Sequence, residues 1–231
     1  MKEMIYMSSK TKSLTNLHPK IVKFQSSIKN RYAEENKTAK KGQIVFVGSS
    51  TMEIFPIEKM QKSLNLDKII YNRGIRATTT EDVLNDIDTL ILDLKPEKVF
   101  INIGSNDVGF GVPLEKFLEN YDKLLSKIKE KLPETMVYIV AYFPVNTVDT
   151  FDEDKEEHHA LFNTRNNANL RKANKSIQTL AQKHGYPFIN LNEGLMDKNG
   201  NLKKELTFDG MHMLPSGYEI VLKNMMQYLK D

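Results

Sequence analysis

The segment "IVFVGSST", residues 44–51, joins an apolar run to three hydroxyl side chains through one glycine. Nearly continuous hydrophobicity over a short run is typical of a strand that is covered on both faces of a sheet. Gly48 allows the chain to turn tightly after such a strand. We therefore predict a buried central strand whose carboxyl end leads into a helix and presents Ser49, Ser50 and Thr51.

Four further runs of this kind alternate along the chain with helical patterns. Strands that alternate with helices imply parallel pairing through right-handed crossovers. The predicted fold class is therefore α/β: a three-layer α/β/α sandwich of flavodoxin-like type with a five-stranded parallel sheet. The predicted strands are residues 43–48, 68–72, 98–104, 136–143 and 187–191.

Helical periodicity is clearest in residues 114–132, where apolar side chains recur every three or four positions before Pro133. Another helix follows Pro215, and Thr78 with Glu81 predicts a capping box at the start of a helix. Residues 19–35 predict an extra N-terminal helix that packs on the α/β unit.

Length and composition favour one domain over residues 1–231, in which residues 1–41 form a basic N-terminal arm and helix. Residues 1–42 hold ten Lys and Arg against three Asp and Glu. This charge could serve a nucleic acid or an anionic surface. Because no recognition motif accompanies it, a solvated helical face is the favoured interpretation, and no nucleic-acid partner is expected.

Several classes of site are disfavoured. The chain has no cysteine, so a disulfide framework, a thiolate metal site and a cysteine nucleophile are excluded. His158 and His159 are adjacent and would point apart on a helix, and no G-x-G-x-x-G or Walker sequence is present. We expect neither a metal nor a cofactor. No apolar run suits a signal peptide or a membrane span, so we expect a cytoplasmic protein.

Five chemically suggestive residues follow the predicted strands. Ser50 follows the first strand, Gly74 the second, Asn106 the third, and Asp209 and His212 come after the fifth. In open parallel sheets, ligands bind beyond the carboxyl ends of the strands. Acyl transfer needs a hydroxyl nucleophile, an imidazole base, a carboxylate that orients the base, and donors for the oxyanion. Each of these roles has a candidate at this edge.

Each feature alone has a simpler explanation. A hydroxyl-rich turn after a strand often caps a helix, Asp209 could cap a turn, and Asn106 lies in ordinary turn chemistry. The conjunction of complementary groups at one edge favours catalysis over these separate structural roles. Ser50 is then the nucleophile, His212 the base and Asp209 its orienting carboxylate, and the N–H groups of Ser50 and Gly74 and the amide of Asn106 are the oxyanion donors.

The same residues resemble the sequence blocks of the SGNH (GDSL-type) hydrolases. The matching blocks are "VGSST", "YNRGIRATTTEDVL", "INIGSNDVG" and "FDGMHMLPSGY", and the branch is similar to platelet-activating-factor acetylhydrolase subunits and bacterial relatives. The resemblance implies an SGNH hydrolase fold and a serine esterase acting on small-molecule esters with small acyl groups, such as acetyl. Two positions depart from the family pattern: Ser49 replaces an Asp, and Ala77 replaces a glycine.

Two alternative functions remain open. One is a non-catalytic, flavodoxin-like module that binds a phosphate or flavin at the turn after the first strand. The other is lysophospholipase or thioesterase activity on longer acyl chains. Acyl length depends on the loops at 105–112 and 144–165, and the acidic stretch 144–158 could be a lid over the site.

Overall fold

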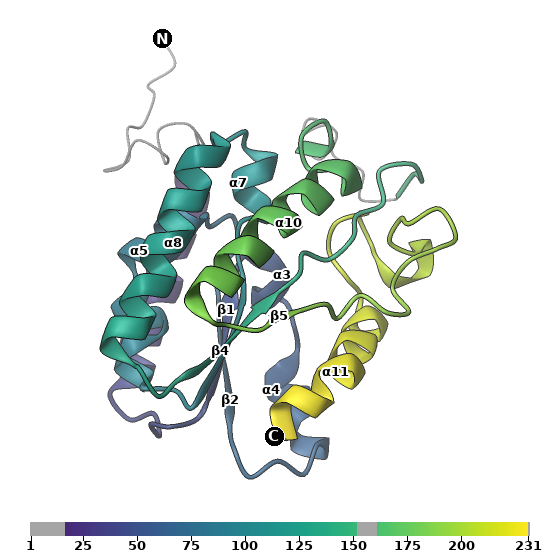
Figure 1. Ribbon diagram of the computed structural model, residues 1–231. Coiled ribbons are helices and arrows are strands. Elements are labelled where there is room, and N and C mark those ends of the chain that lie inside the picture. Colours follow the sequence, from purple (N-terminus) through teal and green to yellow (C-terminus); the bar gives the residue numbers. More distant parts are fainter. Residues whose placement is uncertain (1–16, 152–160, 231) are drawn as a thin grey trace.

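The central feature of the computed structural model is a five-stranded parallel sheet, with strand order β2-β1-β3-β4-β5 (Figure 1). The structure describes residues 17–151 and 161–230. The predicted fold class is confirmed, and the strand order is the one found in flavodoxin-like sheets. The strands are β1 (Ile44–Gly48), β2 (Ile70–Gly74), β3 (Lys98–Asn102), β4 (Met136–Val140) and β5 (Phe188–Ile189).

Helices cover both faces of this sheet (Figure 1). One face packs against α2 (Pro19–Asn36), α5 (Thr80–Asn85), α6 (Ile87–Leu90), α8 (Leu114–Lys131) and α10 (Asn167–His184). The other packs against α3 (Ser50–Glu53), α4 (Ile57–Met60) and α11 (Pro215–Lys230). The remaining elements are α7 (Ser105–Gly109) after β3 and the short 3-10 turns Gln61–Ser63, Leu92–Leu94 and Lys204–Leu206.

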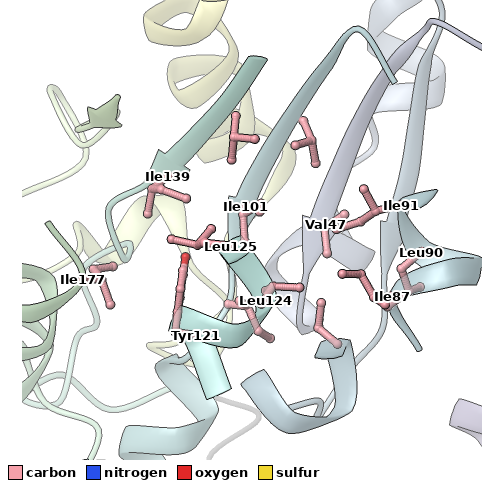
Figure 2. Packing of buried hydrophobic residues seen from close by; sticks show 14 of the residues in the cluster. Val47, Ile87, Leu90, Ile91, Ile101, Tyr121, Leu124, Leu125, Ile139 and Ile177 are labelled. Carbon is pink, nitrogen blue, oxygen red and sulfur yellow. The ribbon is translucent and has the colours of Figure 1, made fainter. Parts of the chain in front are cut away.

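Side-chain alternation along the strands explains why the sheet is buried on both faces. Val45 and Val47 of β1 point into one hydrophobic core, and Ile44 and Phe46 point into the other. Figure 2 shows part of the first core, to which Val47 and Ile101 of the strands and Leu124 and Leu125 of α8 all belong. Fully burying an aliphatic side chain stabilises a fold by roughly 1.5–3 kcal/mol. These two cores therefore fix the carboxyl edge of the sheet in place.

The strand register brings three strand ends level at that edge. Gly48 pairs with Gly74 of β2 on one side and with Asn102 of β3 on the other. The loops that follow these three strands therefore start side by side. This is the point at which the strand order reverses, and in open parallel sheets the ligand crevice lies there.

The N-terminal helix packs on the sheet as predicted. The Tyr32 hydroxyl donates to the carbonyl oxygen of Gly74 at 2.9 Å, and Asn36 Nδ2 donates to the carbonyl oxygen of Thr89 at 2.7 Å. Residues 1–16 of the basic arm lie outside the described residues. In the described part of the chain, no helix combines the length and apolar character needed to cross a membrane.

Two local predictions need correction. The capping box of α5 is formed by Thr79 and Asp82, one position later than predicted, while Thr78 Oγ1 donates to the carbonyl oxygen of Ile75. The long helix α10 was not predicted. Its buried apolar side chains, among them Leu170, Ala173 and Ile177, recur at helical spacing.

The stretch at 144–158 is only partly described. Residues 144–151 have no helix or strand, yet Asn146 is buried and hydrogen-bonded. Residues 152–160, with the two adjacent histidines His158 and His159, lie outside the described residues. The possible lid role of this stretch therefore stays a prediction.

Candidate active site

Ser50 begins α3 immediately after β1, and several contacts fix this turn. Gly48 is required by close approach, because a Cβ there would lie 2.4 Å from the carbonyl oxygen of Asn102. The Tyr218 hydroxyl donates to the carbonyl oxygen of Thr51 at 2.6 Å. The Asn72 amide donates to the carbonyl oxygen of Met52 at 2.6 Å. The turn is thus held from both β2 and α11.

Ser50, His212 and Asp209 form a continuous chain of polar contacts. Nε2 of His212 lies 2.8 Å from Ser50 Oγ, and its Nδ1 lies 2.6 Å from Asp209 Oδ2. Asp209 Oδ1 accepts the backbone N–H groups of Met211 at 2.9 Å and His212 at 2.7 Å. Ser50 and His212, which are 162 positions apart in the chain, thus meet. Together with Asp209 they form the order hydroxyl, imidazole, carboxylate.

The carboxyl group of Asp209 is buried and ionised. Burial raises its pKa, but the hydrogen bond from the His212 side chain, the His212 charge and the two backbone donors outweigh burial, so its pKa is lowered. A carboxylate at this position accepts the Nδ1–H of His212. That tautomer leaves the lone pair of Nε2 directed at the Ser50 hydroxyl.

The turn that carries Asp209 and His212 is held from two sides. Gly210 has φ +80°, and a Cβ there would lie 2.3 Å from the carbonyl oxygen of Asn146. The Phe208 ring stacks on the imidazole of His212, with ring centroids 5.8 Å apart. The imidazole therefore has little freedom to rotate away from Ser50.

Asn106 lies on α7 and its side chain is buried at the same edge. Its Nδ2 donates to the carbonyl oxygen of Thr78 at 2.8 Å, and its Oδ1 accepts from Arg165 Nη2. One hydrogen of the amide nitrogen is used by Thr78, so the second can serve a ligand.

Gly74 is not brought into the site. Its N–H donates to Asn72 Oδ1 at 2.9 Å, and a Cβ at Gly74 would lie 2.3 Å from the backbone nitrogen of Glu53. Its small size is needed for packing against α3. Ala77, three residues later, lies at the cavity instead and has a left-handed backbone with φ +58°.

A cavity of about 440 Å³ opens over these groups. Its polar wall includes Ser50, Asn106 and His212. Its apolar wall includes Ile21 of α2, Ile54 after α3, Phe110 after α7, and Phe208. Sequence reasoning placed no residue of α2 here, so Ile21 was missed, and it gave Ala77 and Arg165 no specific role in the site. The full lining is Ile21, Ser50, Ile54, Arg76, Ala77, Asn106, Phe110, Leu161, Arg165, Phe208, Asp209, Met211 and His212.

The carboxyl group of Asp107 connects α7, the helix that carries Asn106, to α5. Asp107 Oδ1 accepts from Thr80 Oγ1 at 2.6 Å, and Oδ2 accepts the Thr80 N–H at 3.0 Å. Burial raises the pKa of Asp107 to about 7, although both hydrogen bonds from Thr80 oppose the shift. The contact joins α7 to the start of α5.

With this geometry in hand, comparison with known proteins identifies the family. Residues 57–220 match the model of the GDSL-like lipase/acylhydrolase family. The chain belongs to this family. Lipases and acylhydrolases, for which this family is named, cleave ester bonds.

Individual relatives agree with this assignment. A Streptococcus pneumonia structure, described as that of a candidate platelet activating factor, is 28% identical with a TM-score of 0.81, over 96% of this chain and all of that one. The isoamyl acetate-hydrolyzing esterase of Saccharomyces cerevisiae is 25% identical over 169 residues, which cover 70% of this chain and 68% of that protein.

A third relative is a larger protein. The N-acylneuraminate cytidylyltransferase of Streptococcus agalactiae is 26% identical over 146 residues, or 63% of this GDSL-like chain. The matched part spans only 30% of the length of the cytidylyltransferase.

Proposed function

We propose that this GDSL-like protein is a serine esterase that hydrolyses small carboxylic esters through an acyl-enzyme. The observation that carries the proposal is the contact chain from Ser50 Oγ to His212 Nε2 at 2.8 Å and from His212 Nδ1 to Asp209 Oδ2 at 2.6 Å. This order of groups is what activation of a hydroxyl nucleophile requires.

In the first half of the reaction, Ser50 Oγ attacks the ester carbonyl carbon while Nε2 of His212 takes its proton. The tetrahedral intermediate collapses, and His212 gives that proton to the leaving alcohol. In the second half, His212 takes a proton from water, which attacks the acyl carbon on Ser50. The second tetrahedral intermediate collapses, the bond from Ser50 Oγ to the acyl carbon breaks, and His212 returns the proton to Ser50 Oγ as the acid leaves. Asp209 stabilises the imidazolium in both halves and stays ionised.

Three donors are proposed for the oxyanion: the backbone N–H groups of Ser50 and Ala77 and the Nδ2–H of Asn106. Ala77 takes the place predicted for Gly74, because Ala77 lines the cavity and the Gly74 N–H is bonded to Asn72. Donors that are fixed before the reaction stabilise the developing charge without reorganising. Removal of one such donor lowers kcat by roughly 10²–10³-fold.

A small acyl group, such as acetyl, is the proposed substrate feature. The relative from yeast is named for hydrolysis of an acetate ester, and the relative from Streptococcus agalactiae is named for an N-acylneuraminate. The cavity of about 440 Å³ leaves room for a sizeable alcohol part beside a small acyl group. Acetylated sugars, including acetylated N-acylneuraminates, therefore belong in the substrate panel beside simple esters.

The phosphate- or flavin-binding alternative is less well supported. It needs only the turn at Ser49, Ser50 and Thr51 and gives no role to the contact between His212 and Ser50. Activity on longer acyl chains would use the same catalytic groups as the proposed esterase. The dependence of kcat/KM on acyl chain length distinguishes the two.

A set of nitrophenyl esters from acetate to decanoate tests the proposal, followed by the acetyl-sugar panel. We expect kcat/KM to be highest for the short esters. Ser50→Ala should lower kcat by at least about 10⁴-fold, while the neighbouring Ser49→Ala, which removes a hydroxyl outside the contact chain, should keep the rate within about tenfold. Equal activity of wild type and Ser50→Ala would overturn the proposal.

A further inference from the structure

Arg165 places a buried cation in the wall of the cavity. The residue is 3% exposed, and its guanidinium group donates from Nε to the carbonyl oxygen of Ser105 at 3.1 Å. Nη2 donates to Oδ1 of Asn106, and Nη1 donates to the sulfur of Met211. One side chain thus bridges the helix that carries Asn106 and the turn that carries Asp209 and His212.

Within residues 17–151 and 161–230, the three acceptors of Arg165 are all neutral. Burying the cation therefore costs desolvation energy that no ion pair with these residues offsets. Burial lowers the pKa of Arg165 to about 10, opposed by the negative charges of Asp209 and Asp107, so the group is still a cation at neutral pH. A costly buried charge next to a reacting centre calls for a role beyond packing.

The role follows from the two-fold ambiguity of an amide side chain. Arg165 carries only N–H donors, and the carbonyl oxygen of Thr78 only accepts. With Oδ1 toward Arg165 and Nδ2 toward Thr78, both contacts of Asn106 are favourable. Turning the amide by 180° would set donor against donor and acceptor against acceptor. The pair therefore permits a single orientation of Asn106, in which the second Nδ2–H is left for a ligand.

We propose that Arg165 is a positioning residue for ester hydrolysis, which holds the Asn106 amide so that one N–H faces the oxyanion and ties Asn106 to the turn of the catalytic histidine through Met211. The inference rests on the proposed esterase function. A hydrogen bond from a cation to Oδ1 also polarises the amide, which strengthens the opposite N–H as a donor.

A double-mutant cycle between Arg165 and Asn106 tests whether one residue acts through the other. With p-nitrophenyl acetate, a neutral ester, we expect Arg165→Met to lower kcat by about 10–100-fold, with KM changed by less than about threefold. Arg165→Lys keeps the charge and one donor and should recover part of the loss. In an Asn106→Ala background, Arg165→Met should lower kcat by no more than about threefold further.

Two kinetic results would overturn the inference. Losses that multiply fully in the double variant would mean that Arg165 acts independently of Asn106. A change confined to KM, larger for an anionic ester than for p-nitrophenyl acetate, would make Arg165 a substrate-binding group instead. Arg73→Lys is the matched control, because Arg73 is equally buried but does not line the cavity. It should lower the melting temperature and keep kcat.

A measurement without turnover separates this inference from the esterase proposal. In ¹⁵N-labelled protein, we expect the side-chain amide hydrogens of Asn106 to exchange with solvent at least about tenfold more slowly than those of the exposed Asn199. Arg165→Lys should speed the exchange at Asn106 and leave Asn199 unchanged. Equal Asn106 exchange in wild type and Arg165→Lys would contradict the positioning role, even in a protein that hydrolyses no ester.

Discussion

The backbone N–H of Asn146 donates to the carbonyl oxygen of Gly210 at 2.7 Å, and the contact joins the loop after β4 to the turn between Asp209 and His212. The side chain of Asn146 also donates to the carbonyl oxygen of Leu202 at 2.8 Å. The loop after β4 is therefore part of the support of the imidazole, in addition to any role of the residues beyond it.

Gly210→Ala should lower both stability and activity. Gly210 has φ +80°, and the added Cβ would lie 2.3 Å from the carbonyl oxygen of Asn146, so the turn must shift. We expect a loss of about 2–4 kcal/mol in the free energy of unfolding by urea and a lower kcat. Gly200→Ala is the control, since Gly200 has φ +84° with open space around it and should cost only about 1 kcal/mol. Equal losses would refute the close-packing argument.

Ala77→Gly should keep the esterase activity and raise stability slightly. A non-glycine residue at φ +58° costs about 1–2 kcal/mol, and the greater freedom of glycine in the unfolded chain offsets part of the gain. Thermal unfolding should show an increase of up to about 1 kcal/mol in the free energy of unfolding. Gly42→Ala reverses this change at φ +67°, where no atom lies within 4 Å of the new Cβ, and should be destabilising. A destabilised Ala77→Gly protein would contradict the backbone argument.

Asp107→Asn should change how stability depends on pH. The folded-state pKa of Asp107 is raised to about 7 by burial, above its unfolded value near 4. The folded state then binds more protons than the unfolded state. The stabilising contribution of Asp107 is therefore fully present below pH 4 and is lost as the pH rises through about 7. Between pH 4 and pH 8, the free energy of unfolding by urea of the variant should rise relative to that of wild type by up to about 4 kcal/mol. A difference that does not vary with pH would refute the assignment.

Ile21→Ala should change which esters are preferred. Ile21 lies on the N-terminal helix and contributes to the apolar wall of the cavity. Its removal widens the cavity, so kcat/KM for bulky esters should rise relative to p-nitrophenyl acetate by about 4–15-fold, the effect of one or two methylenes at about 0.8 kcal/mol each. Ile28→Ala, on the same helix but in the core, should reduce stability and leave the ratio unchanged. An unchanged ratio in Ile21→Ala would exclude the helix from substrate selection.

The sheet could be predicted from sequence because a strand that is buried on both faces needs a continuous run of apolar residues. The runs 44–47 and 99–101 are apolar at every position, and every one of these side chains is buried. Helix α10 carries a helical pattern too, but half of its buried apolar stripe is alanine, at Ala173 and Ala181, which makes the stripe easy to overlook among polar residues. Both of its ends carry cap signals: the Asn166 side chain accepts the N–H of Asn169, and Gly185 follows the helix with a left-handed backbone.

The side-chain members of the candidate site could be predicted from residue identity. The backbone donor could not, because it depends on the local backbone conformation. Ser50, Asp209 and His212 carry their chemistry in their side chains, and parallel strands bring them to one edge. Glycine was favoured as the backbone donor because of its size, yet the left-handed backbone that reaches the cavity belongs to Ala77. Arg165 lies in the polar stretch "FNTRNNAN", which reads as a surface segment, and its burial is visible only in the fold.

The central claim is that Ser50 is the nucleophile, and labelling by a fluorophosphonate followed by peptide mass spectrometry tests it most directly. The reagent traps an activated serine, so the account predicts one phosphonyl adduct, on Ser50. Labelling should be lost in Ser50→Ala, strongly slowed in His212→Ala, and retained in Ser49→Ala. An adduct on Ser49 or Thr51, or labelling of Ser50→Ala at the wild-type rate, would contradict the account.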